Sequence, residues 1–228
     1  MEHFGVTIKE GKYGFKLTRE NFAVVNPRSS FSGAMMHASC RETLGFDPYT
    51  DDTYMTWTNE WCLWHLNNCM ENYDLNMRYF AQLDKEEFAN CINAFLRKNR
   101  QFIPVADLKL YDGQPGYYLL VLDDYCQAYL GTSDNIMCRI RQHWSNRKAF
   151  DRILFPIGNV TGSVISIDSF RALDTIRIYV RKTSNTYASE NPYIEQIPNK
   201  FLANRIQGGR FLEDFWFPEI KTRELPNS

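Results

Sequence analysis

The run of residues 116–144 constrains the fold of this chain more than any other stretch. Residues 118–122 are apolar or aromatic in the manner of a strand, and the two aspartates that follow them are typical of a turn. Residues 127–130 predict a second strand, and Gly131 predicts its end. The run therefore begins with a predicted β-hairpin.

An amphipathic helix is predicted directly after the hairpin. Asp134 is a candidate N-cap, and Ile136, Ile140 and Trp144 recur at i, i+4 and i+8 as one buried stripe. A second row lies roughly 100° further around the same helix. Its members are Arg139, His143 and Arg147. This basic row either lies in solvent or faces the hairpin and an anion bound there.

Two short motifs in the hairpin give the stretch a family resemblance. Gly-Tyr-Tyr occupies positions 116–118 and Tyr-Leu-Gly occupies positions 129–131, with ten residues between Tyr118 and Tyr129. Arg139 and His143 follow on the predicted helix. The stretch resembles the GIY-YIG nuclease family, which carries a Gly-x-Tyr strand, a Tyr-x-Gly strand, and then an arginine and often a histidine. The middle positions depart from isoleucine, but both remain apolar strand residues.

The resemblance implies an α+β fold, with a small three-stranded antiparallel sheet flanked by helices in residues 107–212. Residues 1–106 would form a hairpin-plus-helices accessory region, and residues 213–228 a C-terminal tail. Asn191, Pro192 and Pro198 mark a loop before the end of the compact unit.

The resemblance also implies catalytic roles in phosphodiester hydrolysis. Tyr118 would act as general base for a water molecule, and Tyr129 would orient the water or the phosphate. Arg139 would hold the phosphate oxygens through its planar fork, and His143 could share the proton of Tyr118. Asn204 best matches a further asparagine of the family.

A divalent metal, Mg²⁺ or Mn²⁺, is the implied cofactor. The family places one acidic residue, normally glutamate, as its sole protein ligand, and Asp174 falls at the expected position. Aspartate is one methylene shorter, but Mg²⁺ accepts few protein ligands and several waters. Glu190 and Glu195 remain substitutes.

The N-terminal half predicts mainly helices. Asp84 and the acidic residues after it predict a capped helix over residues 85–99, and aromatic residues at helical spacing predict one or two helices within residues 53–80. Alternation in residues 6–17 predicts a hairpin around Gly11, and residues 26–45 predict an irregular connection.

Two further elements are predicted after the basic helix. Residues 150–156 read as a third strand closed by Gly158. Asp168 is a candidate cap for a second helix. The apolar positions of that helix are Phe170, Leu173, Ile176 and Val180.

Charge is unevenly distributed although the total is only −1. Residues 107–210 carry 13 basic and 10 acidic side chains, whereas residues 1–106 carry 11 and 13, and residues 211–228 carry 2 and 4. The middle segment is thus mildly positive, and a nucleic acid, in the first place DNA, is the expected partner.

No run of residues is apolar enough for a membrane helix, and a signal peptide is not evident, so a cytoplasmic location is expected. Six cysteines lie within apolar or helical patterns, which favours reduced thiols. Cys62, His65 and Cys69 could in principle bind zinc, but no second pair of ligands is evident, and core packing is favoured.

Three functions remain open. The first is a metal-dependent endonuclease, and the second is a catalytically reduced domain that binds nucleic acid or protein. The third is a protein-binding first half carried on the second half as a scaffold. The length fits one or two domains, and the sequence does not fix the oligomeric state.

Overall fold

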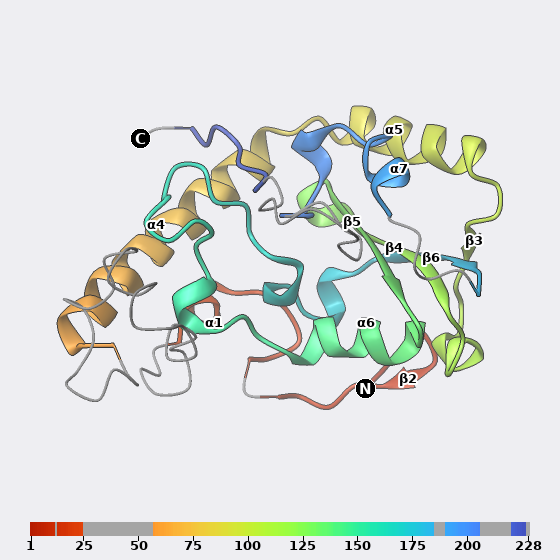
Figure 1. Ribbon diagram of the computed structural model, residues 1–228, viewed down its shortest axis with the longest axis horizontal. Helices are drawn as coiled ribbons and strands as arrows, with labels where there is room; N and C mark the ends of the chain where they lie inside the picture. Colours follow the sequence, from red (N-terminus) through yellow and green to blue (C-terminus); the bar gives the residue numbers. More distant parts are fainter. Residues whose placement is uncertain (12, 25–56, 185–189, 206–219, 227–228) are drawn as a thin grey trace, which may run out of the picture.

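A computed structural model describes residues 1–11, 13–24, 57–184, 190–205 and 220–226. The described chain is α+β, as expected (Figure 1). Its helices are α1 (Arg19–Phe22), α4 (Asn59–Gln82), α5 (Lys85–Lys98), α6 (Ile136–Ser145) and α7 (Asn191–Ile194). Its strands are β1 (Glu2–His3), β2 (Val6–Thr7), β3 (Ile103–Pro104), β4 (Gly116–Leu122), β5 (Gln127–Ser133) and β6 (Arg177–Lys182).

The main sheet has four antiparallel strands in the order β3-β6-β4-β5, rather than the three expected. The fourth is the short edge strand β3, which pairs with β6. Because β3 lies before residue 107, the sheet includes residues from both sides of the expected domain boundary.

Strand β4 is the centre of the sheet and is buried along its whole length. It pairs with β5 on one side and with β6 on the other. Its side chains alternate between two hydrophobic clusters, with Tyr118 and Leu120 in one and Tyr117 and Leu119 in the other. A strand covered on both faces requires the nearly continuous apolar sequence found here.

Helices cover both faces of this sheet. In Figure 1, α5 and α6 lie on opposite sides of the strands. Helix α6 contributes Ile136, Ile140 and Trp144 to the cluster that contains Tyr118. Helix α5 contributes Phe88, Ile92 and Phe95 to the cluster that contains Tyr117.

The predictions for residues 116–144 are largely confirmed. The hairpin is formed by β4 and β5, but β5 continues past Gly131 to Ser133. The stripe of α6 is buried as expected. The N-cap of α6 is Asn135 rather than Asp134, because the Asn135 side chain accepts a hydrogen bond from the backbone N–H of Cys138.

Two predictions made for the residues after α6 are wrong. Residues 150–156 form no strand; they begin with the short 3₁₀ helix Phe150–Arg152, and Phe150, Ile153 and Leu154 are buried at helical spacing instead of alternating.

The second helix predicted after Asp168 is also absent. That segment contains two 3₁₀ turns followed by strand β6. Ile178 and Val180 are buried while their neighbours in β6 are not, so the period is that of a strand. Branched side chains at these positions favour the extended backbone.

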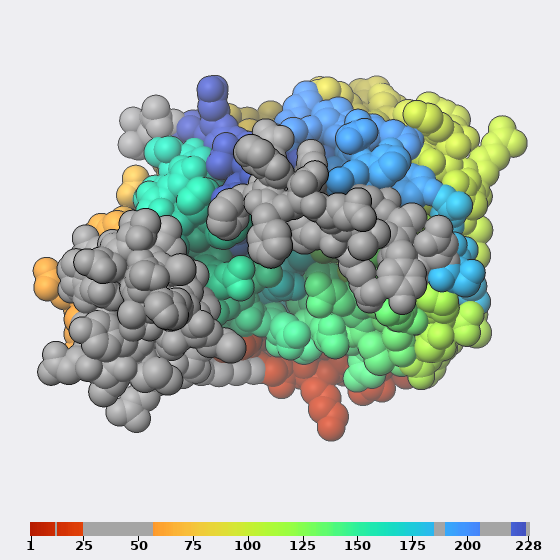
Figure 2. Space-filling model, in the orientation of Figure 1, coloured from red at the N-terminus to blue at the C-terminus, as the bar shows by residue number. Residues whose placement is uncertain are grey.

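The expected N-terminal hairpin has a different register. Strands β1 and β2 are joined by Phe4 and Gly5, which both have positive φ, and not by a turn at Gly11. The N-terminal segment lies against α6, where His3 and Trp144 have ring centroids 5.5 Å apart. Figure 2 shows the red N-terminal residues beside the green residues of α6.

Both long helices of the first half agree with expectation. Helix α5 is capped by Asp84, whose side chain accepts from two backbone N–H groups, and α4 carries buried Trp57 and Trp61 in or near its first turn. The expected irregular connection over residues 26–45 and the first part of the helical region over residues 53–80 lie outside the described residues.

One core joins the two halves of the chain. Trp61 and Phe80 of α4 share a cluster with Leu120 of β4. In the tail, Thr222 forms an antiparallel bridge with Ser163, so described residues 220–226 fold back onto the body. Within the described part of the chain, no helix combines the length and apolar character needed to cross a membrane.

Gly131 is required by close packing. A Cβ atom at Gly131 would overlap the ring of Tyr118, its partner in the β4–β5 register. We expect Gly131→Ala to displace the Tyr118 ring and to lower the free energy of unfolding by about 1–3 kcal/mol in urea denaturation. Gly11→Ala is the control, because nothing lies within 4 Å of its added Cβ atom. Equal stability of the two variants would contradict this account.

Candidate functional site

A cavity of about 300 Å³ lies on the face of the sheet that α6 covers. Side chains from β5, α6 and the later loops line it. They are Tyr129, Arg139, His143, Lys148, Arg152, Phe155, Ser166, Ile167, Asp168, Glu190, Ala203, Asn204 and Arg205. Four of the predicted site residues line this cavity, whereas Tyr118 lies behind it and Asp174 lies elsewhere.

Tyr118 is fully buried and reaches the site through its hydroxyl group. Its hydroxyl lies 2.8 Å from Nε2 of His143. Burial raises the pKa of Tyr118 well above its usual value, and nearby Tyr129 adds to this effect while Arg139 opposes it. The Tyr118 phenol is therefore neutral at physiological pH.

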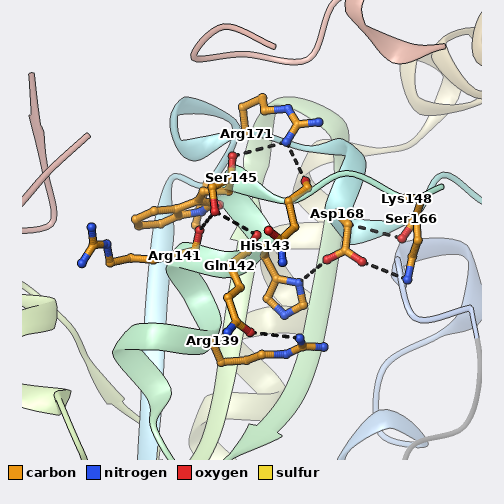
Figure 3. Close-up of polar contacts among 12 residues, drawn as sticks. Arg139, Arg141, Gln142, His143, Ser145, Lys148, Ser166, Asp168 and Arg171 are labelled. Carbon is orange, nitrogen blue, oxygen red and sulfur yellow. Dashed lines mark hydrogen bonds and ion pairs between the residues drawn. The ribbon is translucent and has the colours of Figure 1, made fainter. Parts of the chain in front are cut away.

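His143 connects Tyr118 to a buried carboxylate. Its Nδ1 lies 2.6 Å from Oδ1 of Asp168, and the other Asp168 oxygen lies 2.9 Å from Nζ of Lys148 (Figure 3). An ionised carboxylate only accepts, so Nδ1 of His143 carries the proton and Nε2 accepts from the Tyr118 hydroxyl. The four groups form one continuous chain of polar contacts.

The charge states along this chain follow from their surroundings. Burial lowers the pKa of His143, and the hydrogen bond to Asp168 opposes that change in part. Burial alone would raise the pKa of Asp168, but the hydrogen bond from His143 and the Lys148 ammonium outweigh it and hold this pKa well below its usual range. At neutral pH the chain contains a neutral imidazole beside an ionised carboxylate.

Sequence reasoning did not assign Asp168 and Lys148 to this role. Asp168 was predicted to cap a helix that does not form. Asp168 forms no short motif with His143, because 25 positions separate the two residues. Sequence spacing therefore carried no signal for this pair.

Tyr129 and Arg139 are two of the predicted site residues that line the cavity. The rings of Tyr118 and Tyr129 have centroids 6.2 Å apart on the same face of the hairpin. Burial raises the pKa of Tyr129 to about 12, although Arg139 acts in the opposite direction. The pKa of Arg139 is lowered by its burial but raised more strongly by the two phenols, so the guanidinium stays charged.

Asn204 reaches the cavity wall, but its amide binds the backbone. Its Oδ1 accepts from the N–H of Leu130 at 3.1 Å, and its Nδ2 donates to the Leu130 carbonyl at 2.8 Å. Arg147, the last member of the predicted basic row, points away from the cavity and donates to the carbonyls of Phe22 and Val24. Asn204 thus fixes the strand that carries Tyr129.

Asp174 is not brought to the cavity. It is fully buried in a 3₁₀ turn, where Oδ2 accepts from the backbone N–H groups of Leu17 and Arg171 and Oδ1 accepts from the hydroxyl of Tyr125. Burial raises its pKa, and these hydrogen bonds oppose that change. The contacts identify a structural carboxylate that joins the N-terminal segment to the turn before β6.

Glu190 lines the cavity together with Asp168, whereas Asp174 does not. Glu190 immediately precedes α7 and is 8% exposed. Its Oε2 has no hydrogen-bond partner among the described residues. Burial raises the pKa of Glu190, while Arg139 lowers it. Sequence reasoning retained Glu190 as a substitute for Asp174. The Asn-Pro pair that follows Glu190 marks a helix start, and this was the signal that could have drawn attention to the residue.

Zinc binding by the cysteines of α4 finds no support in the geometry. Nε2 of His65 lies 2.6 Å from the carbonyl of Phe150 and 3.5 Å from Sγ of Cys69, inside the core. Within the described ranges, no group of three or more His, Cys, Asp or Glu side chains could hold a metal ion.

Comparison of the chain with protein-family models, with curated proteins and with solved structures gives no match.

Asp174 provides a test of the distinction between structural and functional carboxylates. We expect Asp174→Asn to fold, because the amide oxygen can still accept from the two backbone N–H groups. Asp174→Ala should lose about 1–3 kcal/mol for each buried N–H left without an acceptor, measured by urea denaturation. Loss of metal binding in Asp174→Asn with unchanged stability would contradict this assignment.

Proposed function

We propose that this protein is an endonuclease of the GIY-YIG type that hydrolyses phosphodiester bonds of DNA. The observation that carries the proposal is the convergence of Tyr129, Arg139 and Glu190 on one cavity, with the Tyr118–His143 hydrogen bond directly behind it. These residues come from β4, β5, α6 and the turn before α7. A structural role alone gives no reason for a phenol, a guanidinium and a carboxylate without a full set of partners to meet there.

Arg139 is the proposed phosphate ligand. Among the described residues, its guanidinium donates one long hydrogen bond, 3.3 Å from Nη1 to Gln142 Oε1, and also interacts with Tyr118, so donors remain available to an anion. A planar guanidinium binds two phosphate oxygens at once and stays charged throughout the reaction. Its position beside both phenols would place the phosphorus next to the group that activates water.

Glu190 is the proposed metal ligand in place of Asp174. Its free, buried Oε2 satisfies the requirement of a hard divalent cation for an oxygen donor. With a single carboxylate ligand, water and phosphate oxygens would complete the coordination. A bound Mg²⁺ or Mn²⁺ would supply charge neutralisation at the leaving 3′ oxygen.

The proton of the attacking water has a continuous route to a base. Tyr129 faces the cavity, so its oxygen would take a proton from water while its own proton passes to Tyr118 and the Tyr118 proton passes to Nε2 of His143. The imidazolium formed is stabilised by Asp168. The route needs no ionised phenol, which the raised pKa values of Tyr118 and Tyr129 disfavour.

Cleavage of supercoiled DNA with Mg²⁺ or Mn²⁺ tests the proposal. We expect Tyr118→Phe, Arg139→Gln and Glu190→Gln each to lose about 10²-fold or more in rate, since the first interrupts the proton route and the other two remove groups that act at the reacting phosphate. Two neighbours serve as controls. Tyr117→Phe changes a tyrosine on the opposite face of β4, and Glu195→Gln changes an exposed carboxylate, so both should cut normally.

Two results would redirect the proposal. Salt-sensitive binding of DNA without cleavage by the parent protein would favour a catalytically reduced binding domain. Full activity of Glu190→Gln would remove Glu190 from the metal site.

The pH dependence of the cleavage rate distinguishes the two possible bases. Because neutral His143 must accept the proton and its pKa lies below 6.5, the rate should stay constant above neutral pH and fall only as the pH drops through that lowered value. Asp168→Asn should reduce the rate by roughly one to two orders of magnitude and move this acid limb to lower pH, because loss of the carboxylate weakens the imidazole as a base. A rate that instead climbs with pH toward about 12 would identify a tyrosinate.

A further inference from the structure

Arg205 lines the cavity and has hydrogen-bond donors without a partner among the described residues. The side chain is 8% exposed and lines the cavity wall. Nη1 donates to the carbonyl of Arg152 at 3.3 Å, but Nε and Nη2 have no partner among the described residues. Burial, together with repulsion from Arg152, lowers the pKa of Arg205 to about 10, so it remains charged at neutral pH. Among the described residues no carboxylate forms an ion pair with this buried cation, although Asp168 acts on it from a distance.

Arg223 provides a contrast. This arginine is also buried, but its Nη2 donates to Gln127 and to the carbonyl of Leu202, and its guanidinium lies 4.9 Å from the ring centroid of Tyr79. Arg223 does not line the cavity. Arg223 likewise has two donors, Nε and Nη1, without a partner among the described residues. What distinguishes Arg205 is its place in the wall of a cavity of about 300 Å³.

Arg205 and Arg139 have different neighbours within the cavity wall. Arg139 interacts with Tyr118, Tyr129 and Glu190. Arg205 interacts with Arg152, and its guanidinium lies 5.3 Å from the ring centroid of Phe155. Asp168 is the acidic group that influences both arginines. The two guanidinium groups therefore have separate surroundings within one cavity.

The charges of the cavity favour a second anion besides the phosphate proposed to bind Arg139. Four cations line it, Arg139, Lys148, Arg152 and Arg205, against the two acids Asp168 and Glu190. Lys148 already pairs with Asp168. Arg152 is exposed and could add to the attraction at the end where Arg205 lies. One scissile phosphate does not balance this set.

We infer that Arg205 binds a second phosphate of the substrate strand, adjacent to the phosphate that is cut. The inference rests on the proposed function, because it takes the substrate to be a nucleic-acid strand with regularly spaced phosphates. Two arginines with separate surroundings would bind consecutive phosphates and so fix the strand's register over Tyr129. Contacts of this kind position the backbone without reading its sequence.

The salt dependence of DNA binding tests the inference. A labelled DNA duplex is titrated with the full-length protein in EDTA, so that no cleavage occurs, over a series of salt concentrations. Each phosphate contact contributes about 0.9 to the slope of log K against log salt concentration. We expect Arg205→Gln and Arg139→Gln each to reduce the slope by about 0.9, and the double variant to reduce it by about 1.8.

Control variants separate this effect from a general loss of charge or of folding. Arg97→Gln removes an exposed charge from α5, on the opposite face of the sheet, and should leave the slope unchanged. Thermal denaturation of Arg205→Gln without DNA should give an unchanged or higher Tm, because the variant removes a buried, unpaired charge. If Arg205→Gln does not fold, Arg205→Lys replaces it, and this variant should keep the slope but bind more weakly because it lacks the planar fork.

Three results would overturn the inference. They are an unchanged slope in Arg205→Gln, unchanged affinity in Arg205→Lys, and a double variant that loses no more slope than either single variant. The last result would mean that both arginines bind one phosphate. If the parent protein cuts DNA but the variants give one of these three results, only the second phosphate site is rejected. If it binds DNA with the expected slopes but never cuts, the nuclease proposal fails and the site remains.

Discussion

The folded structure depends on the burial of strand β4 on both of its faces. Each side chain of β4 enters one of two hydrophobic clusters, and its backbone is paired on both edges. Burial of such a strand requires α4, α5 and α6 to pack against the sheet, so the two halves of the chain share the same central element. Gly116 and Gly131 show how close this packing is, because a Cβ atom at Gly116 would meet the carbonyl of Arg181 and one at Gly131 would meet Tyr118.

The candidate site lies at the edge of this closely packed core, which holds its polar groups in place. Tyr118 hydrogen-bonds to His143, His143 to Asp168, and Asp168 to Lys148. Such a chain is costly to bury unless each member has its partner, and it fixes one tautomer of the imidazole. In contrast, Glu190 and Arg205 are buried with unused polar atoms. Paired groups would set the proton path, and unpaired groups would receive the substrate and its cation.

Sequence reasoning succeeded where the physical signal was local. The hairpin and α6 follow from strand propensity and from an apolar repeat within one element, and Asp84 caps α5 through neighbouring N–H groups. It failed where short apolar runs fit two periods. The residues of β6 were assigned to a helix because Phe170, Leu173, Ile176 and Val180 match helical spacing, although Ile178 and Val180 alternate as in a strand. Asp174 was selected as metal ligand from that mistaken helix.

The sequence by itself determined the central hairpin, the helix behind it, and the presence of Tyr129, Arg139 and His143 on facing surfaces, because these residues lie within one short stretch and local geometry relates them. Only the tertiary structure decided where each carboxylate lies and which groups it contacts. Asp174 turned inward to backbone N–H groups, Asp168 met His143, and Glu190 reached the cavity with a free oxygen. The positions of these carboxylates depend on loops that connect distant segments. Packing against the whole core sets the course of those loops, and no periodicity in the chain does so.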